Sequence, residues 1–583
     1  MILPAFPRLA FRKGLFAGVL CSLLRIGDMA AHSQRTEWML QAAVILAGLR
    51  GAMVGRNLPI GSDGLAYLDV ARAYLRHDWT TALNGYWGPL YSWLLAGMEL
   101  VFRPAPEHEF LAVRAVNGMI LVFCVFAFGS FWKSVAKWSR RSGSEGIALF
   151  EGSPVAWLYL GYILLATRIL WLVEEVSPDL LVGGIVLLAC SEVFQLNEGR
   201  HDAILRYARL GLLLAIGYYA KAILIYFGIF VLAALISRGV RTGSSGGPIA
   251  ALVVSLALVS PHTVALSRAL GHFSLGESGR LNYAWFVDGT ETGSWAQGGA
   301  SFPFFPGAIF LNYPRVFQVP HIDGVTYAPW YDAARFDKRS QPSFSFRKQA
   351  RQVAVNLKSL KEDILGTESA LLVCLIILIG FAPQAFYRNL AQAWFCAVPV
   401  CLVIGMYLLV HLADRFMVGF LLVLWGILFA SIRAPLNLQT LSRRALLAGT
   451  IVFAMATFPG LLRLAFSAAP NPMKNDLRIS ESLRALGIQK NDAVGLIGDG
   501  QTAYWAYWAR LSIASEVPAM DAAQFWSGSA EQQRAAVWAM ENAGAKAVIW
   551  RRDSGRACLE NWKSLPDDSG CIIVLHPIAA QKE

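Results

Sequence analysis

The chain has 583 residues, of which 56% are hydrophobic and only 15% are charged, and its mean hydropathy is +0.46. Soluble globular proteins average about 45–50% apolar and about 25% charged residues, so this composition excludes an ordinary soluble domain. The formal net charge of +12 would suggest nucleic-acid binding in a soluble chain. Here the basic residues lie mostly in short loops between apolar runs, and no basic patch is interleaved with aromatic residues. We therefore expect a membrane protein with no nucleic-acid partner.

Residues 1–36 form a basic N-terminal extension in which Arg8, Arg12 and Lys13 precede a short apolar stretch. No convincing cleavage site follows Ala31, which argues against a secretory signal. We expect a cytoplasmic extension or a helix on the membrane surface. Translation beginning nearer Met29 is the alternative.

Apolar runs follow between residues 37 and 467, each extending to roughly the 20 residues that a helix needs to cross hydrocarbon. With the basic clusters assigned to the cytoplasm, the run at 204–236 is ambiguous. A single tilted helix there would place the basic residues of 433–444 outside. A hairpin with Lys221 near its outer tip places every basic cluster inside, so the prediction is a hairpin and about 11 crossings in total.

This topology exports two loops, 56–110 and 268–367, and the tail 468–583. The tail is predicted to be a small α/β domain, with strands at 493–497, 512–517 and 547–550 and helices at 503–511 and 531–543. Its glycines occur in the order GxxGxG, which is not a dinucleotide fingerprint, so tight turns are the better interpretation and no cofactor is expected. The second loop is rich in aromatic residues and prolines and is expected to cover the site.

Cys558 and Cys571 both lie in the exported tail, whereas the other six cysteines lie in apolar runs or on the cytoplasmic side. A pair of cysteines in an oxidising compartment is a plausible disulfide. Two buried free thiols are the alternative, and the sequence does not decide between them.

The first exported loop places Asp63 and Tyr67 on one face of an expected helix. Asp63 could cap this helix, since aspartate is a preferred cap residue, or could act as a base. Asp69 points away from that face, so the two carboxylates are not expected to hold a metal. A turn rich in aromatic residues, Asn84–Tyr91, follows and contains Trp87, which alone could belong to an interfacial belt.

Other candidates are charged residues at the ends of apolar runs, on the predicted outer side: Glu174, Glu175, Asp179, Lys221, Asp414 and Arg415. Ionisable residues in such runs are functional candidates by default. A lysine can also reach toward the headgroups with no further role, and an arginine at a helix end can be a topology anchor. These structural alternatives remain open for Lys221 and Arg415.

Taken together, the exported Asp63, Tyr67 four residues later and the WGPLY turn resemble the first periplasmic loop of bacterial GT-C glycosyltransferases. The group in question includes the protein O-mannosyltransferases and lipid A aminoarabinose transferases. Three further segments are similar to that group: Ser177–Leu181 (SPDLL), Gly217–Lys221 (GYYAK) and Ala413–Phe416 (ADRF). The chain departs from it in having Asp63-Gly64 where Asp-Glu is common, and Phe416 in place of Tyr.

The resemblance implies an inverting transferase in the bacterial inner membrane, using a polyprenyl-phosphate-linked sugar and a lipid, glycan or protein acceptor. Asp63 would be the base that takes the acceptor proton. Lys221 and Arg415 would stabilise the lipid phosphate as it leaves. Asp414, Glu174, Glu175 and Asp179 would orient these cations or bind sugar hydroxyls. A transporter or flippase of lipid-linked glycans and a non-catalytic scaffold are the alternatives, although the internal repeats typical of transporters are not evident.

Overall fold

The computed structural model describes residues 33–141, 146–197, 203–242, 246–289, 309–312, 314–336, 341–466, 473–551, 558–566 and 569–575. Residues 1–32 of the expected N-terminal extension therefore lie outside the described residues.

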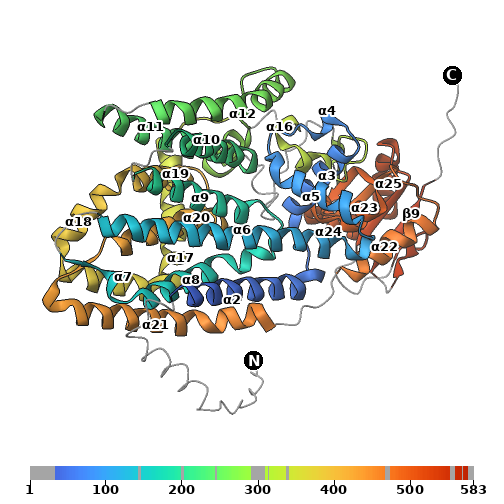
Figure 1. Ribbon diagram of the computed structural model, residues 1–583. Coiled ribbons are helices and arrows are strands. Elements are labelled where there is room, and N and C mark those ends of the chain that lie inside the picture. The colour runs from blue at the N-terminus through green and yellow to red at the C-terminus, as the bar shows by residue number, and fades with distance from the viewer. Residues whose placement is uncertain are drawn as a thin grey trace, which may run out of the picture.

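The larger part of the chain is a bundle of long apolar helices that lie side by side (Figure 1). Within the described residues, seven are long and apolar enough to cross a membrane: α2 (Ser33–Val54), α6 (Pro106–Arg141), α8 (Pro154–Ile169, continued by η4, Trp171–Val173), α9 (Asp179–Leu196), α12 (Gly246–Leu270), α17 (Phe346–Phe381) and α21 (Gln439–Phe466). An eighth span is formed if the bent pair α18 (Pro383–Gln392) and α19 (Trp394–Leu409), which meet at 81°, is taken as one.

Three further apolar helices of 17–19 residues belong to the same bundle: α10 (Ala203–Ala220), α11 (Leu224–Thr242) and α20 (Asp414–Ala430). Together with the eight, they would make the 11 crossings that hydropathy and charge predicted. The expected fold class, an α-helical polytopic membrane protein with a small α/β domain, is thus the observed one.

The region at 204–236 is a hairpin, as the charge distribution predicted. α10 ends at Ala220, Lys221 lies between the helices, and α11 begins at Leu224. At 1.5 Å per residue, helices of 18 and 19 residues are about 27–29 Å long, close to the thickness of the hydrocarbon core. The run at 204–236 predicts two helices each shorter than a normal span, which would thin or locally distort the bilayer. The helices extend beyond that run at both ends, so they are longer than predicted.

The two loops that the charge distribution predicts to be exported are called the first and second exported loops. The first folds into short helices, η3 (Gly55–Asn57), α3 (Gly61–Leu75), α4 (Trp79–Ala82) and α5 (Pro89–Phe102). The second contains α13 (Ser278–Asn282), η5 (Tyr283–Val287), β2 (Ile309–Asn312), β3 (Arg315–Gln318), α15 (Ala328–Tyr331) and α16 (Ala333–Phe336). α17 begins at Phe346 and carries helix through about the last fifth of the predicted range 268–367.

The tail contains α22 (Lys474–Ala485), β5 (Ala493–Gly498), η7 (Gly500–Thr502), α23 (Tyr504–Ala509), β6 (Ser512–Pro518), η8 (Ala519–Asp521), α24 (Ala522–Ser527), α25 (Ala530–Asn542), β7 (Ala547–Arg551), β8 (Lys563–Ser564) and β9 (Gly570–Val574). A seven-stranded sheet has the order β2-β3-β6-β5-β7-β9-β8, with β5 parallel to β6 and β7. Small elements between the membrane helices are β1 (Ile147–Ala148), α7 (Leu149–Gly152), β4 (Arg433–Ala434) and η6 (Leu436–Leu438).

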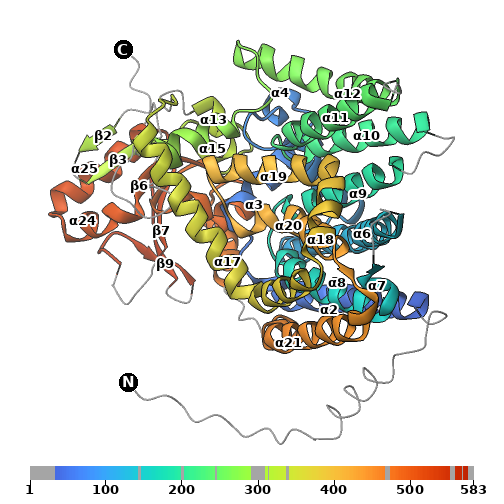
Figure 2. The ribbon, with the colours of Figure 1, turned by 90° about the vertical axis from the view of Figure 1, so that its left-hand side faces the viewer.

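Two strands of this sheet come from the second exported loop. The sequence predicted the loop but not its contribution to the sheet. β3 pairs antiparallel with β6, with Phe317 opposite Glu516, and β2 pairs with β3. Figure 2 shows β2 and β3 beside α25 at the end of the molecule that α17 reaches from the bundle. The loop and the tail therefore form one structural unit. Within it, Cys558 and Cys571 are joined by a disulfide with a Cα–Cα distance of 5.7 Å.

Glu109, at the start of α6, ties this unit to the first exported loop. Its buried carboxylate accepts hydrogen bonds from Arg72 of α3 at 2.6 Å, from the Tyr507 hydroxyl at 2.6 Å and from the Trp508 indole at 3.1 Å. Asp69, also on α3, accepts from the Thr326 backbone N–H at 2.9 Å. Because buried charged groups need such partners, these bonds fix the position of α3 between the bundle and the α/β unit.

Candidate functional site

Five of the charged residues selected from the sequence meet at one end of the helical bundle. We call Asp63, Glu175, Asp179, Lys221 and Arg415 the charged cluster. They come from the first turn of α3, the turn before α9, the N-terminus of α9, the tip of the α10–α11 hairpin and the N-terminus of α20. Four segments far apart in the sequence thus converge on one site.

Arg415 is the centre of the charged cluster. Its Nη2 donates to Asp63 Oδ2 at 2.7 Å, its Nε lies 3.3 Å from Asp179 Oδ2, and its Nη1 lies 3.9 Å from Glu175 Oε2. A planar guanidinium suits this role, because its several N–H groups can face different carboxylates at once. The topology-anchor interpretation of Arg415 does not account for these contacts.

Lys221 reaches the same carboxylate as Arg415 from the opposite side. Its Nζ donates to Asp179 Oδ1 at 2.6 Å and lies 3.5 Å from the centroid of the Phe416 ring. Ser177 Oγ donates to Asp179 Oδ2 at 3.1 Å. Lys221 is therefore held against Asp179 and Phe416 by an ion pair and a cation–π contact.

The two aspartates of the charged cluster differ in exposure. The side chain of Asp179 is 2% exposed and that of Asp63 is 20% exposed. Within the described part of the chain no hydrogen bond reaches Oδ1 of Asp63, and α3 has no side-chain cap hydrogen bond. Asp179 thus contacts both cations, whereas Asp63 makes no cap hydrogen bond and remains partly exposed.

A close approach of two helices sets the spacing of Asp179 and Arg415. Each residue lies one turn before a glycine, Gly183 on α9 and Gly419 on α20, and a Cβ added at Gly419 would lie 2.7 Å from the Gly183 Cα. Helices approach this closely only where side chains are absent. The glycine pair therefore brings the N-termini of α9 and α20, and the residues on them, into contact range.

The aromatic turn before α5 forms a wall beside the charged cluster. Asn84 Oδ1 accepts from the backbone N–H groups of Tyr86 and Trp87 at 2.8 and 2.9 Å, which closes the turn. The centroid of the buried Tyr67 ring lies 4.9 Å from that of the Trp87 ring. A Cβ at Gly88 would lie 2.7 Å from the carbonyl oxygens of Tyr219 and Ala220, so the turn packs directly on the hairpin tip that carries Lys221.

The second exported loop adds further rings to this wall. Tyr86 contacts Trp285 and Trp330 at centroid distances of 5.6 and 5.8 Å, and Trp285 stacks on Trp330 at 6.1 Å. Aromatic faces pack well against the C–H surfaces of ligands. The expectation that this loop covers the site agrees with its position, although sequence reasoning assigned no role to these residues individually.

His411 is a neighbour of the charged cluster that sequence reasoning missed. Its ring stacks on the Phe286 ring, with the two ring centroids 3.8 Å apart. Burial, together with the cations Arg415 and Lys221, lowers the pKa of His411 to about 4, so the ring is neutral at physiological pH. The signal available in the sequence was its position four residues before Arg415, in the short segment between two apolar runs.

Two of the predicted residues lie elsewhere. The Glu174 carbonyl accepts a hydrogen bond from Arg114, and its side chain lies against Gly55, away from the charged cluster. Asp414 faces Asp363 and Arg168 instead. Within that second group Arg168 Nη1 pairs with Asp363 at 2.6 Å, in a buried setting among α8, α17 and α20.

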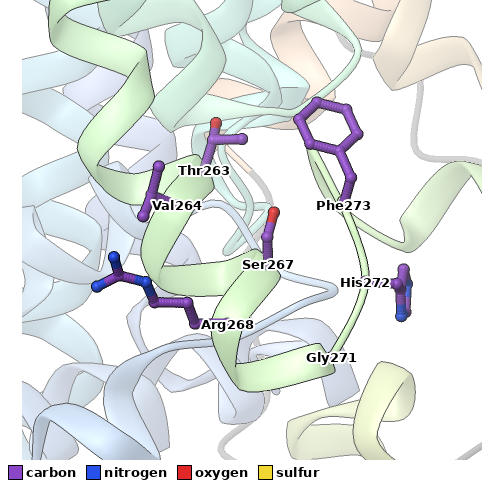
Figure 3. A pocket seen from close by; sticks show the side chains of 7 residues that line it. All are labelled: Thr263, Val264, Ser267, Arg268, Gly271, His272 and Phe273. Atoms are coloured by element: carbon purple, nitrogen blue, oxygen red, sulfur yellow. The ribbon is translucent and has the colours of Figure 1, made fainter.

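A cavity of about 470 Å³ lies close by, at the C-terminal end of α12 (Figure 3). Thr263 and Ser267 on the last turns of α12 and Phe273 in the segment that follows are among its lining residues. Gly276 and Glu277, a few residues further on, contact the hairpin tip and the first exported loop at Ala222 and Gly85. The cavity therefore adjoins the elements that carry the charged cluster but does not contain it.

No protein-family model matches the sequence, and no curated protein matches it. Among solved structures, the chain is similar to ArnT from Cupriavidus metallidurans bound to undecaprenyl phosphate, with a TM-score of 0.42, 12% identity, and coverage of 93% of this chain and 98% of that one. It is also similar to the oligosaccharyltransferase of Archaeoglobus fulgidus in the apo form, with a TM-score of 0.47, 12% identity, and coverage of 88% of this chain and 69% of that one. A likeness at this level does not transfer those proteins' ligands to this chain.

The charged cluster suits a particular kind of chemistry. It combines a carboxylate oxygen that solvent can reach with two cations held in place by a buried third group. Such an arrangement can accept a proton at one point while it stabilises negative charge at another. Within the described ranges no group of three or more His, Cys, Asp or Glu side chains is arranged to hold a metal ion, and Arg415 lies between the carboxylates of the cluster.

Proposed function

We propose that the chain is an inverting membrane glycosyltransferase that transfers a sugar from a polyprenyl phosphate to an acceptor hydroxyl. The observation that carries this proposal is the contact of Arg415 with both Asp63 and Asp179, reinforced by Lys221. The resemblance of the first exported loop to that of bacterial GT-C enzymes supports it independently. We further propose that the enzyme resides in the bacterial inner membrane, with the charged cluster and the α/β unit on its periplasmic side.

In the proposed reaction, the acceptor oxygen attacks the anomeric carbon from the face opposite the lipid phosphate. Asp63 takes the proton of the acceptor hydroxyl as the new C–O bond forms. The bond between the anomeric carbon and the phosphate oxygen breaks, and its electron pair stays on that oxygen. Attack from the opposite face inverts the configuration of the anomeric carbon.

Arg415 and Lys221 act on the leaving group. Both cations are positioned before the reaction by Asp179, so they need no rearrangement as negative charge grows on the phosphate. A bound phosphate also competes for the guanidinium that otherwise pairs with Asp63, which frees the Asp63 carboxylate to act as a base. Glu175, half exposed at the rim of the cluster, and the wall of Tyr67 and Trp87 are positioned to contact the sugar.

The test is transfer of radiolabelled sugar from a panel of polyprenyl-phosphate donors, measured in membranes that contain wild-type protein or Asp63→Asn. We expect the variant to lose on the order of 10²- to 10⁴-fold in rate, the usual contribution of general base catalysis. Asp414→Asn is the matched control, because Asp414 neighbours Arg415 in sequence but faces away from the cluster. Equal transfer by wild type and Asp63→Asn would remove Asp63 from the mechanism, and absence of transfer from every donor would refute the function itself.

A further inference from the structure

The exposed face of α17 changes in composition along the helix. Over residues 346–362 this face carries five basic side chains and a single acidic one, Glu362. From Leu365 to the end of the helix the exposed residues are uncharged and include Val373 and Ile376, which are 56% and 60% exposed. Exposed apolar residues on a helix of membrane length face hydrocarbon, so the change marks the point at which α17 enters the membrane.

Contacts on the opposite face of α17 place this change at the end of α20 that carries the charged cluster. Asp363 faces Asp414, the first residue of α20. Five residues later, Glu368 accepts a hydrogen bond from the Trp425 indole at 2.8 Å, well inside α20. Figure 2 shows α17 running obliquely to α19, so the first half of α17 rises from the membrane by less than its length. The basic part of α17 therefore begins at the membrane boundary, at the level of the charged cluster.

Four of the five basic side chains form a line along the exposed face of α17. Successive helical residues point about 100° apart, which places these four within an arc of about 80°. The fifth, Lys348, lies at the edge of the face and donates to the Asp288 carbonyl at 2.7 Å. We call the four the basic stripe: Arg347, Arg351, Lys358 and Lys361.

The charge of the basic stripe is not neutralised by the described part of the chain. Lys358 lies 3.9 Å from Glu362, with both side chains exposed, and the other three members of the stripe have no ion-pair partner among the described residues. Ion pairs as exposed as this one contribute little. Apolar side chains flank the stripe: Phe346, Val355 and Leu357 are 79%, 50% and 48% exposed. A helix face that combines basic and apolar side chains is typical of the membrane interface.

We propose that the basic stripe binds the head groups of anionic phospholipids in the leaflet on the side of the α/β unit. Lys358 and Lys361 lie within about two turns of Leu365, where the exposed face becomes apolar, so their ammonium groups reach the phosphates that border the hydrocarbon. The two arginines contact head groups further along the surface, and Leu357 packs against the first acyl carbons. Lysines and arginines that adjoin a membrane helix attract anionic lipids, whereas a polyanion in water would leave the flanking apolar side chains exposed to solvent. The basic stripe contains no residue of the charged cluster, and this proposal is independent of the transfer reaction.

A fluorescent label within the basic stripe reports which lipid lies next to it. The label is attached at Ala354→Cys, an exposed position between Arg351 and Lys358. Cys401→Ser and Cys21→Ser remove the exposed cysteine and the one outside the described residues, and the other free cysteines are buried. The full-length labelled protein is reconstituted in phosphatidylcholine bilayers. It is then titrated with phosphatidylglycerol or phosphatidylcholine that carries a nitroxide near the top of one acyl chain, which quenches a label close to it.

We expect phosphatidylglycerol to reach half-maximal quenching at a mole fraction about tenfold lower than phosphatidylcholine does. Arg351→Gln/Lys358→Gln in the labelled protein should remove most of this preference. Lys490→Gln/Arg534→Gln, which removes the same charge from exposed positions of the α/β unit, is the matched control and should keep it. Thermal unfolding establishes that each variant is folded. Equal quenching by the two lipids, or an equal loss of preference in the control, would overturn the proposal. Absence of quenching by either lipid would show that the stripe faces water and would overturn it as well.

Discussion

Arg415 and Asp63 are 352 residues apart in the chain, and their side chains are joined by a 2.7 Å hydrogen bond within an ion pair. The proposed base and the proposed cation of the leaving-group site therefore hold each other before substrate binds. In the proposed reaction, a phosphate that takes the guanidinium would release the carboxylate. Under this proposal, binding of the donor and activation of the base are coupled through one side chain.

This coupling predicts the behaviour of Arg415→Lys. An ammonium group keeps the charge but cannot face Asp63, Asp179 and Glu175 together, so we expect kcat to fall by about 10²- to 10³-fold, as when one preorganised donor is removed. Sugar transfer under saturating donor measures the effect.

A double variant sharpens the same prediction. Because Arg415 and Asp63 act as a unit, Arg415→Lys combined with Asp63→Asn should be little worse than Asp63→Asn alone. Arg76→Lys, which alters an arginine bound to backbone carbonyls of Asp323 and Gly324, should retain near wild-type transfer. Strictly multiplicative losses in the double variant would contradict the coupling.

Gly419→Ala is expected to impair transfer by displacing the cluster. The added methyl group would meet the Gly183 Cα at 2.7 Å, and overpacking of this kind costs about 1–3 kcal/mol. The helices must separate, which moves Arg415 relative to Asp179. Since misplacement of about 1 Å can cost about 10²-fold in rate, we expect a loss of tenfold or more in kcat.

The matched control for this change is Gly405→Ala on α19, where an added Cβ meets nothing within 4 Å. We expect this variant to insert into the membrane normally, and to have the melting temperature and the rate of sugar transfer of wild type. Should Gly419→Ala keep full activity in normally inserted protein, the spacing of α9 and α20 would not be critical for the site.

Much of the architecture could be predicted because its signals are local. Apolar runs of membrane length and the scarcity of charges at their ends singled out Asp179, Lys221 and Arg415 as candidates, whereas Asp63 was selected from its place on a helix face in the first exported loop. The hairpin at 204–236 followed from charge bias alone. In each case a single stretch of sequence carries the physical constraint, namely the cost of placing a charge or a loop in hydrocarbon.

Two kinds of feature could not be predicted: the direction in which a given side chain points, and the pairing of strands that are far apart in the sequence. Glu174 and Glu175 are neighbours, as are Asp414 and Arg415, and in each pair only the second residue reaches the cluster. Asp414 and Arg415 lie in the first turn of α20, where successive residues point about 100° apart, as 3.6 residues per turn requires. Glu174 and Glu175 lie in the irregular segment before α9, where no helical period predicts the direction of a side chain. β3 joined β6 across about two hundred residues, and a four-residue strand carries no local signal for such a partner.

Loss of the disulfide should destabilise the α/β unit. Cys558 and Cys571 are separated by 13 positions, and closing a loop of that size in the unfolded chain corresponds to about 3 kcal/mol. We expect Cys558→Ser/Cys571→Ser to lower the melting temperature of this unit. Tryptophan fluorescence recorded during heating measures that temperature. Cys401→Ser, at an exposed free cysteine, is the control, and an unchanged melting temperature in the double variant would refute a stabilising role.

Glu516 should make the stability of the α/β unit depend on pH. The carboxyl group accepts from the Tyr327 hydroxyl at 2.7 Å and from the Gly500 N–H at 3.1 Å, and burial raises its pKa to about 8. In the unfolded chain a glutamate has a pKa of about 4.3, so the folded state holds a proton that the unfolded state releases. The contribution to stability is therefore fully present below about pH 4.3 and is lost as the pH rises through 8.

The difference between wild type and Glu516→Gln isolates this residue, because the other buried carboxyl groups titrate equally in both proteins. Burial raises the pKa of Asp476 to about 6, that of Glu99 to about 8 and that of the neighbouring Asp499 above its usual range. One proton corresponds to about 1.4 kcal/mol per pH unit, so the melting temperature of wild type should fall steadily between about pH 6 and 8. Glu516→Gln cannot release a proton and should flatten the fall, whereas Glu531→Gln, at an exposed position of α25, should leave it unchanged. Parallel curves for wild type and Glu516→Gln would show that Glu516 does not carry the proton.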